Sequence, residues 1–338
     1  MRILVTGATG YIGSHTVLLL LEHGYEVVAV DNFSNSDNDS LNRIRETTNH
    51  SFVFEQIDVC DQSSLTNLLI RNPCDAVIHF AGFKSVGESI NKPLEYYENN
   101  LNSTLTLLKI MKEFPAVLKS KIIFSSSANI YGNSDKQPIL EDFPTGVGLT
   151  NPYGRTKYFC EEILRDTSAS WPELQAISLR YFNPIGAHPS GLIGEFPDKI
   201  PNNLAPYITK VASGELSEIS VFGNDYRTKD GSGVRDFIHV LDLAEGHIAA
   251  LNYSEPGFHA FNLGTGKGTS VFELIKAFEI ASSRTLPFSV KARRSGDLAI
   301  SVADVTKATN ELGWKPKLSV LDACISAWSW EQTRHNNK

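Results

Sequence analysis

The sequence predicts an α/β protein, with a Rossmann-type doubly wound parallel sheet followed by a smaller C-terminal α/β substrate domain. Short apolar strands alternate with helical stretches through residues 1–183, and a glycine-rich turn follows the first strand. From about residue 184 this alternation is interrupted by stretches rich in glycine, proline and asparagine. We therefore expect a first domain at 1–183 and a second domain mainly at 184–338, with a later segment, at about 235–262, returning to the first.

Composition and charge narrow the class of protein and of partner. The 338 residues include 31 Lys and Arg against 38 Asp and Glu, a formal charge of −7, which argues against non-specific binding of nucleic acid or anionic membranes. No apolar run approaches the length of a transmembrane helix and no secretory leader precedes the first strand, so we expect a cytoplasmic protein. The cysteines lack the paired spacing of metal ligands, so we expect reduced, buried thiols and no metal site: Cys60, Cys74, Cys160 and Cys324.

The first strand, Arg2–Thr6, runs into a turn with three glycines. Gly7 and Gly10 allow the backbone to turn tightly and approach a pyrophosphate, and Gly13 lets the following helix pack closely on the strand. The N-terminus of that helix favours a phosphate, because its first N–H groups and its dipole point at the ligand. A tight turn without a ligand is the alternative, but the complete strand, turn, helix and strand favour a dinucleotide site.

Asp31 ends the second strand, which covers residues 25–30. Its distance from the glycine turn is the one that the dinucleotide pattern requires. The carboxylate can accept hydrogen bonds from the ribose hydroxyls of the cofactor, whereas a 2′-phosphate would be repelled. The sequence therefore predicts NAD rather than NADP.

The next strands place small and polar residues at their carboxyl ends, the edge of a parallel sheet where ligands bind. Asp58 follows the third strand and can contact an adenine edge. The fourth strand ends at Ala81 and Gly82, against which a dinucleotide can lie. Asn99, in a helix at 93–114, can reach the cofactor, although a solvated face is the simpler interpretation of this asparagine-rich turn.

The fifth strand, 121–124, leads into Ser125–Ser127, and a helix after Pro152 carries Tyr153 and Lys157. Residues four apart lie on one face of a helix. A neighbouring ammonium favours phenolate, so we expect Lys157 to lower the pKa of Tyr153, which can then exchange a proton with a substrate hydroxyl. The spacing alone is weak evidence, because it also arises by chance.

Four motifs together resemble those of the extended short-chain dehydrogenase/reductase family: Thr-Gly-x-x-Gly-x-x-Gly at 6–13, His-Phe-Ala-Gly at 79–82, Ser-Ser-Ser before Ile-Tyr-Gly at 125–132, and Tyr-x-x-x-Lys at 153–157. The resemblance extends nearly end to end. Later stretches, at 180–191, 200–204, 221–226 and 233–240, are similar to those of members that epimerise UDP-hexoses at C4. The resemblance implies an NAD-dependent isomerase of galactose metabolism that interconverts UDP-glucose and UDP-galactose through a transient 4-keto sugar.

The resemblance also implies roles for individual residues. The catalytic set would be Ser127, Tyr153 and Lys157, with Ser127 chosen over its two neighbours because it immediately precedes Ala128-Asn129-Ile130-Tyr131-Gly132. The implied cofactor contacts are Gly7, Gly10, Tyr11, Ile12, Gly13, Asp31, Asn32, Asn35, Ser36, Asp58, Val59, Phe80, Ala81, Gly82, Lys84, Asn99, Tyr153, Lys157 and Phe182. The implied UDP-sugar contacts are Lys84, Ser127, Tyr153, Asn183, Asn203, Leu204, Phe222, Arg235, Arg294, Asp297 and Ser301.

Arg235 and Arg294 are also candidates for a diphosphate clamp on chemical grounds, because a guanidinium meets phosphate oxygens with two parallel hydrogen bonds. Ordinary surface arginines are the commoner case, but Arg235 lies in an otherwise apolar stretch, which favours function. Asp297 can accept a ribose hydroxyl. His188 and His239 have no partners at metal-ligand spacing, and we expect both to be structural.

Two residues depart from the commoner family pattern. Phe237 replaces a tyrosine and so lacks one hydroxyl. Ser301 stands where some members carry a bulky tyrosine beside the sugar, and members with a small residue here tend to accept N-acetylated sugars. We therefore expect activity on UDP-GlcNAc and UDP-GalNAc as well. The alternative is that a neighbouring side chain fills the space at Ser301.

Other functions on the same fold stay open. The core motifs do not distinguish a UDP-glucuronate or UDP-arabinose epimerase, and a non-catalytic NAD-binding protein would have no reason to keep the Tyr/Lys pair. A 4,6-dehydratase would need an acid/base pair where Ala128 and Asn129 stand. The resemblance further implies a homodimer formed by the helices after Pro93 and Pro152.

Overall fold

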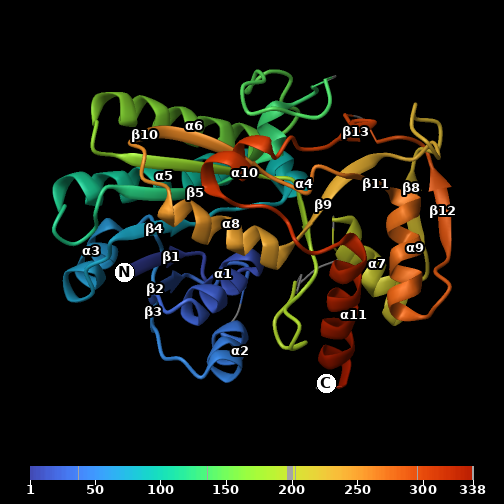
Figure 1. Ribbon diagram of the computed structural model, residues 1–338, viewed down its shortest axis with the longest axis horizontal. Helices are drawn as coiled ribbons and strands as arrows, with labels where there is room; N and C mark the ends of the chain where they lie inside the picture. The colour runs from blue at the N-terminus through green and yellow to red at the C-terminus, as the bar shows by residue number, and fades with distance from the viewer. Residues whose placement is uncertain (37, 135, 196–200, 202, 295, 337–338) are drawn as a thin grey trace.

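The computed structural model describes residues 1–36, 38–134, 136–195, 201, 203–294 and 296–336. Its largest sheet, here called the main sheet, consists of Arg2–Thr6 (β1), Glu26–Asp31 (β2), Val53–Gln56 (β3), Ala76–His79 (β4), Lys121–Ser127 (β5), Gln175–Tyr181 (β6) and Gly257–Leu263 (β10). All its strand pairs are parallel, in the order β10-β6-β5-β4-β1-β2-β3 (Figure 1). The predicted fold class, a doubly wound α/β protein, is confirmed.

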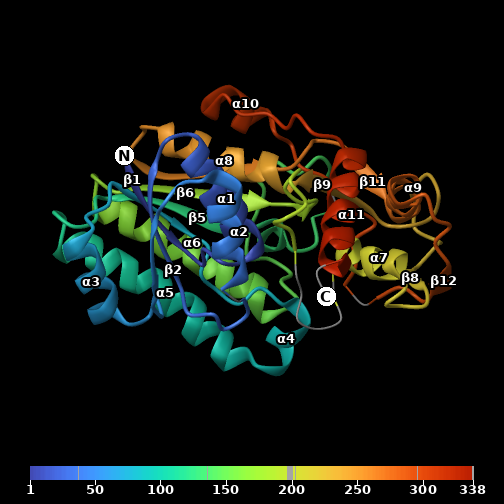
Figure 2. The same cartoon turned by 90° about the horizontal axis from the view of Figure 1, so that it is seen from below.

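Two helical layers cover the main sheet (Figures 1 and 2). Ile3 and Val5 of β1 pack into one buried cluster with residues of the helices Tyr11–Glu22 (α1), Asp39–Thr48 (α2), Val240–Asn252 (α8) and Thr306–Leu312 (α10). Leu4, which points to the opposite face, packs with Gln62–Arg71 (α3), Pro93–Glu113 (α5) and Pro152–Ser170 (α6). This alternation explains why the central strands are apolar throughout, since both faces are buried.

A second region, the C-terminal lobe, gathers at one end of the molecule in both views (Figures 1 and 2). Its strands are Asn183–Ile185 (β7), Ile219–Phe222 (β8), Val234–His239 (β9), Gly268–Ser270 (β11), Phe288–Lys291 (β12) and Ile300–Ser301 (β13). Its helices are Leu204–Ser213 (α7), Val271–Ser282 (α9) and Val320–Asn336 (α11). The lobe has its own buried cluster, which includes Ile208, Phe237, Phe278 and Trp328.

The chain passes between the two regions more than once. Strand β6 runs through Phe182 into β7, which pairs with β9 in the lobe. After β9 the chain returns as α8 and β10, and β10 pairs with β6 from Gly257 to Leu263. The main sheet is therefore completed by a strand that follows part of the lobe in sequence.

The register of the main sheet brings several chain segments to one edge. Thr6 of β1 lies opposite Val30 of β2 and His79 of β4. The segments that continue from the ends of these strands, beginning at Gly7 after β1 and at Asp31 at the end of β2, therefore lie next to each other at this edge. Among the described residues, no helix is long and apolar enough to cross a membrane.

Candidate active site

The glycine turn after β1 is packed too closely for larger residues. Gly7 has a φ of +67°, and a Cβ there would lie 2.7 Å from the backbone nitrogen of Ala81. A Cβ at Gly13 would lie 2.1 Å from the carbonyl oxygen of Gly7. Helix α1 begins at Tyr11 after Gly10, and no side chain in the described part of the chain caps its first N–H groups. The turn and the open helix end therefore suit a pyrophosphate.

Asp31 organises the loop after β2. Its carboxylate accepts hydrogen bonds from the backbone N–H groups of Thr9 and Phe33, both at 3.0 Å, and from the Ser36 hydroxyl at 3.3 Å. A carboxylate has about four acceptor positions, so one is left for a ribose hydroxyl. The residues present at this position fit the adenosine end of a dinucleotide.

Asn32 and Asp58, both predicted cofactor contacts, meet beside Asp31. The Asn32 amide donates to Oδ2 of Asp58 at 3.2 Å, and the N–H of Ile57 donates to the carbonyl of Asp31 at 3.1 Å. Asn35 lies exposed on the same loop. The structure thus brings the predicted adenosine-binding residues to one edge of the main sheet.

The Asn99 amide donates to Oδ1 of Asn100 at 3.0 Å, and its contact with the cofactor stays a prediction. Asn100 is the buried member of this asparagine-rich turn. Its side chain accepts from Phe83 N at 2.7 Å and donates to the Thr156 hydroxyl at 2.9 Å, so it ties the loop after β4 to α6. A solvated face is the wrong interpretation for Asn100. The sequence signal for this buried role was the run of asparagines itself, because asparagine is a mediocre helix former.

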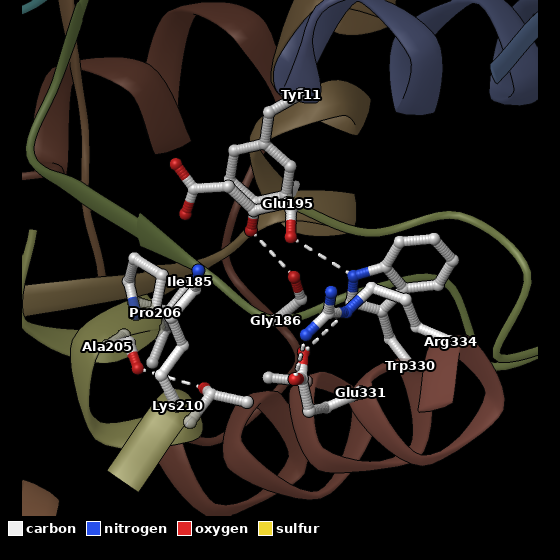
Figure 3. Close-up of a pocket in the computed structure, with 12 residues that line it drawn as sticks. Tyr11, Ile185, Gly186, Glu195, Ala205, Pro206, Lys210, Trp330, Glu331 and Arg334 are labelled. Atoms are coloured by element: carbon white, nitrogen blue, oxygen red, sulfur yellow. Dashed lines mark hydrogen bonds and ion pairs between the residues drawn. The ribbon is translucent and has the colours of Figure 1, made fainter. Parts of the chain in front are cut away.

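Tyr11 and Lys84 point toward the lobe rather than along the sheet edge. The Tyr11 hydroxyl donates to the Gly186 carbonyl at 2.7 Å, and the Lys84 ammonium lies 5.9 Å from the Tyr11 ring centroid. Lys84 also pairs with Glu195 at 3.5 Å. Figure 3 shows the pocket that Tyr11 enters, which is lined further by residues of α7 and α11, including Trp330. Of its lining residues, Tyr11 is the one that the sequence predicted as a contact.

Tyr153, Lys157 and Ser127 converge at the carboxyl ends of β5 and β6. The Asn151 side chain caps α6 by accepting the N–H of Gly154 at 2.8 Å, so Tyr153 lies in the first turn. The Ser127 side chain lies close enough to the Tyr153 phenol to lower its pKa. Lys157 donates to the Ser125 carbonyl at 2.5 Å. The predicted catalytic residues are therefore together in space.

The electrostatics of this cluster differ from the sequence-based expectation. Burial raises the pKa of Tyr153, and the nearby Ser127 side chain offsets only part of that effect. Burial also lowers the pKa of Lys157 to about 8. The expectation that Lys157 by itself holds Tyr153 below its ordinary pKa is wrong for the protein alone, because loss of solvent opposes the charged form of both groups.

Four of the predicted substrate contacts lie in the lobe: Phe222, Arg235, Arg294 and Asp297. The Arg294 guanidinium stacks 3.7 Å from the Phe222 ring centroid. Arg235 donates to the Leu298 carbonyl at 2.8 Å, and its nearest carboxylate, Asp297, is 4.0 Å away. Burial lowers the pKa of Arg235, so this cation is incompletely compensated and suits an anionic ligand.

The remaining predicted contacts lie just after β6 and in the lobe. Phe182 is buried, and Asn183 donates to the Asp236 carbonyl at 3.1 Å. Asn203 precedes Leu204 at the start of α7. The motif that includes these two residues also contains Ile200 and Asn202, which lie outside the described residues. Ser301 lies in β13, opposite Arg235 in the parallel pair with β9.

Asp236 is a site residue that the sequence analysis missed. It is fully buried, and its carboxylate accepts from Thr265 N at 2.7 Å, from Gly266 N at 3.0 Å and from Ala303 N at 3.2 Å. It thus holds two loops beside Arg235. An acid directly after Arg235, followed by apolar Phe237 and Ile238, was the available signal, because a buried charge needs several donors.

Tyr226 was likewise not predicted as a contact. Its ring is buried under Arg293, 4.1 Å from the guanidinium, and its hydroxyl has no hydrogen-bond partner among the described residues. Burial and then Asp297 raise the pKa of this phenol. The hydroxyl therefore stays protonated, as a donor close to Arg235 and Asp297.

The histidines expected to be structural make local contacts. His239 precedes α8 and accepts the N–H of Leu241 at 3.1 Å, and His188 bonds the Ser190 hydroxyl at 2.8 Å. Elsewhere, in the part of the chain that the structure describes, Glu215, Glu331 and His335 bring possible metal-ligand atoms within 4.8 Å of one another. Arg334 donates to both carboxylates, so this group forms an ion-pair network.

The fold and this site define a class of protein. A glycine turn and an acid lie at one edge of a parallel sheet, and a Ser/Tyr/Lys cluster lies at the carboxyl ends of neighbouring strands. That combination is typical of dinucleotide-dependent short-chain dehydrogenases/reductases. A model of the NAD dependent epimerase/dehydratase family matches residues 3–264. The chain belongs to this family.

Individual relatives are similar over their whole length. A UDP-glucose 4-epimerase of Bacillus subtilis (strain 168) is 51% identical over 338 residues, which cover 99% of this chain and 98% of that protein. The crystal structure of UDP-glucose 4-epimerase from Bifidobacterium longum, in complex with NAD+ and UDP, has a TM-score of 0.94 at 49% identity, with all of both chains covered.

A second solved structure, the UDP-glucose-4-epimerase from Stenotrophomonas maltophila, contains bound NAD and formylated UDP-arabinopyranose. Its TM-score is 0.96 at 44% identity, and all of both chains is covered. Both solved structures are thus similar to this chain across the main sheet and the lobe alike.

Proposed function

We propose that the protein is a UDP-glucose 4-epimerase, an NAD-dependent isomerase that interconverts UDP-glucose and UDP-galactose through a transient 4-keto sugar. The observation that carries this proposal is the convergence of Tyr153, Lys157 and Ser127 at the carboxyl ends of β5 and β6, the edge of the main sheet that also carries the glycine turn. Similarity to named UDP-glucose 4-epimerases over the full chain supports it.

The residues present fit NAD. The glycine turn and the start of α1 would hold its pyrophosphate, Asp31 its adenosine ribose, and Lys157 its nicotinamide ribose. When bound, the cofactor accepts a hydride from C4 of the sugar and returns it to the opposite face, and its positive ring favours the phenolate.

The reaction needs a group that takes the O4 proton and later gives it back. Tyr153 has that role: it lies beside Ser127, whose hydroxyl would also position O4. The Lys157 ammonium, fixed by the Ser125 carbonyl, stabilises the phenolate one helical turn away. Burial alone favours the neutral phenol, so the base forms only when further positive charge is nearby.

Arg235, Arg294 and Phe222 grip the nucleotide in this proposal, through the diphosphate and the uracil face. The sugar is held more loosely, and that asymmetry permits the 4-keto sugar to turn before the hydride returns. The test is product analysis by purified protein with UDP-glucose and with UDP-galactose. Formation of the other hexose from each supports the function, and its absence from both contradicts it.

Acceptance of N-acetylated sugars is a separate part of the proposal, and it rests on Ser301. This small residue lies beside the buried strand that carries Arg235, where a tyrosine would occupy more volume. We expect wild type to interconvert UDP-GlcNAc and UDP-GalNAc, and Ser301→Tyr to lose that activity while keeping the glucose pair. If the wild type shows no activity on the acetylated pair, the proposal that N-acetylated sugars are accepted is wrong.

Two other functions use the same fold. An epimerase of UDP-glucuronate or UDP-arabinose would share every residue of the catalytic cluster, so a panel of UDP-hexoses, UDP-N-acetylhexosamines, UDP-glucuronate and UDP-pentoses decides between them. A non-catalytic NAD-binding protein would show no absorbance of reduced nicotinamide after addition of UDP-sugar. The buried Ser/Tyr/Lys cluster favours an enzyme.

The localisation, oligomeric state, pathway and domain boundaries of the enzyme are also proposals. We infer a cytoplasmic homodimer that acts in galactose metabolism, with residues 1–183 and the segment at about 235–262 forming the NAD domain, and 184–338 mainly binding the UDP-sugar. Exposed apolar side chains on or beside α5 and α6 support pairing of these helices: Ile90, Leu94 and Phe159 are 60%, 77% and 41% exposed. Light scattering after gel filtration tests the dimer, and a monomeric mass contradicts it.

A further inference from the structure

An ion pair between Glu161 and Arg180 is buried beneath the catalytic cluster. Their side chains are 1% and 2% exposed. Two parallel contacts join them, from Arg180 Nε to Oε1 at 3.1 Å and from the terminal nitrogen to Oε2 at 2.7 Å. Ser126 and Ser178 each donate to Oε1 at 2.6 Å. The carboxylate is therefore surrounded by donors, as a buried charge requires.

Arg180 extends the network to three more segments. Its other terminal nitrogen donates to the Tyr131 hydroxyl at 2.8 Å and to the Glu141 carbonyl at 2.9 Å. Tyr131, in the 3-10 turn Ala128–Tyr131 (η1), donates in turn to Asn262 of β10 at 2.7 Å. One continuous set of hydrogen bonds thus joins α6, β5, β6, η1 and β10.

The position of Glu161 relates it to the reacting groups. It follows Lys157 by four residues and Tyr153 by eight, so all three lie along one face of α6. Ser126, which donates to Glu161, immediately precedes Ser127. Glu161 therefore connects the helix that carries the base to the strand that carries Ser127.

We propose that Glu161 is a positioning residue, whose charged carboxylate locks α6 onto β5 and β6 and keeps Tyr153, Lys157 and Ser127 in register. It does not touch the substrate. This inference rests on the proposed function, because register matters to turnover only if these three groups carry the reaction. Misplacement of a reacting group by about 1 Å costs on the order of 100-fold in rate.

The charge of Glu161 also acts on Lys157. Burial lowers the pKa of Lys157 to about 8, and the nearby Cys160 and Glu161 oppose that effect. The other titratable or charged groups around Lys157 are Tyr153 on α6, His79 on β4 and, behind Glu161, Arg180 on β6. Loss of the Glu161 charge therefore makes the Lys157 ammonium less stable at neutral pH.

The experiment compares Glu161→Gln with Glu161→Asp in the holoenzyme. Glu161→Gln should lower kcat about 10-fold to 100-fold at little change in KM, and move the alkaline limb of the pH profile down by roughly one unit. Glu161→Asp keeps the charge and shortens the side chain, so kcat should fall while the limb stays. If Glu161→Gln does not fold, Glu161→Asp carries the test.

Glu331→Gln is the matched control, because Glu331 and Arg334 form another buried ion pair, at 7% and 9% exposure, away from α6. A merely structural role predicts equal losses in melting temperature for both Gln variants and an unchanged pH limb in both. Unaltered kcat in both Glu161 variants, or the same kinetic change in Glu331→Gln, would overturn the inference.

Hydrogen–deuterium exchange gives a readout that does not depend on turnover. Peptides covering 152–160 should exchange faster in both Glu161 variants than in wild type, and not in Glu331→Gln. If wild type lacks epimerase activity, the proposed function fails, while this measurement still decides whether Glu161 anchors the helix. Unchanged exchange in the Glu161 variants contradicts the inference on its own.

Discussion

The two sides of the proposed active site hold their ligands by different means. On the main-sheet side a tight backbone turn, in which a Cβ at Gly13 would lie 2.1 Å from the Gly7 carbonyl, adjoins the Asp31 carboxylate, which is bonded to its own loop. On the lobe side they are long side chains, and Arg235 is paired only at 4.0 Å. A backbone cradle is rigid, whereas arginines adapt. The difference fits a cofactor that stays and a substrate that must turn and leave.

The largest expected effect is on Tyr153, the proposed general acid–base. Tyr153→Phe should lower kcat about 10²-fold to 10⁴-fold, the usual contribution of a general acid–base, because no other phenol replaces it in the first turn of α6. Calorimetry should find NAD and UDP affinities close to those of wild type. Tyr158→Phe, five residues later on the same helix, is the control and should retain turnover. Near-normal kcat in Tyr153→Phe would remove this residue from the mechanism.

Removal of a lobe arginine should weaken the binding of UDP and leave the binding of NAD unchanged. Arg235→Ala is expected to raise the Kd for UDP by about 10-fold to 100-fold, since a hydrogen bond to a charged group contributes roughly 1.5–3 kcal/mol. NAD affinity should not change. Arg293→Ala is the matched control, because Arg293 is more exposed and pairs with Asp225 at 2.7 Å. Equal losses of UDP affinity in both variants would contradict a specific diphosphate contact at Arg235.

A methyl group in the backbone cradle should reduce stability as well as cofactor binding. Gly13→Ala places a Cβ against the Gly7 carbonyl, and overpacking of this kind costs about 1–3 kcal/mol. Urea unfolding of the apoprotein measures the loss. Gly154→Ala, where the nearest atom is 3.5 Å away, should not lower stability. If Gly13→Ala is as stable as wild type and binds NAD normally, the cradle is not rigid.

The smallest expected effect of a single residue is the loss of stability that each of four buried histidines causes at mildly acidic pH. Burial lowers the pKa of His15 and His239 to about 4, and that of His79 and His247 to about 3. The unfolded chain binds protons to these groups near pH 6.5 and the folded chain does not, so stability falls as pH drops from about 6.5 toward 4.

Urea unfolding at pH 7.0 and at pH 5.5 measures this dependence. Each of the four histidines should account for about 1 kcal/mol of the loss between the two values. His247→Gln should flatten the dependence, whereas His50→Gln, at an exposed position, should leave it unchanged. A free energy of unfolding that is constant over this range would contradict the buried, neutral state of these histidines.

Most of the main sheet can be predicted from local patterns in the sequence. The glycine turn, the apolar strands and Asp31 are each readable within one βαβ unit, and the structure places them as expected. The spacing of Tyr153 and Lys157 likewise depends only on helical periodicity. These features are predictable because the physical constraint and the residues that meet it are neighbours in the chain.

The rest depends on partners far apart in the chain. Arg180 is 19 residues from Glu161 and 49 from Tyr131, and no local rule pairs them. Asp236 similarly depends on loops near Thr265 and Ala303. The direction of the Tyr153 pKa shift was missed for the same reason, because burial is set by the tertiary structure and outweighs a charge that the sequence shows.

The order in which the strands appear has a consequence for synthesis of the chain. Strand β10 covers the outer edge of β6 along seven residue pairs, yet it is made only after β7, α7, β8, β9 and α8. Until then the growing chain presents an open, apolar strand edge, which can pair with another unfinished chain. A fragment ending at residue 183 would keep that edge permanently, and it should accumulate as aggregates while the complete chain does not.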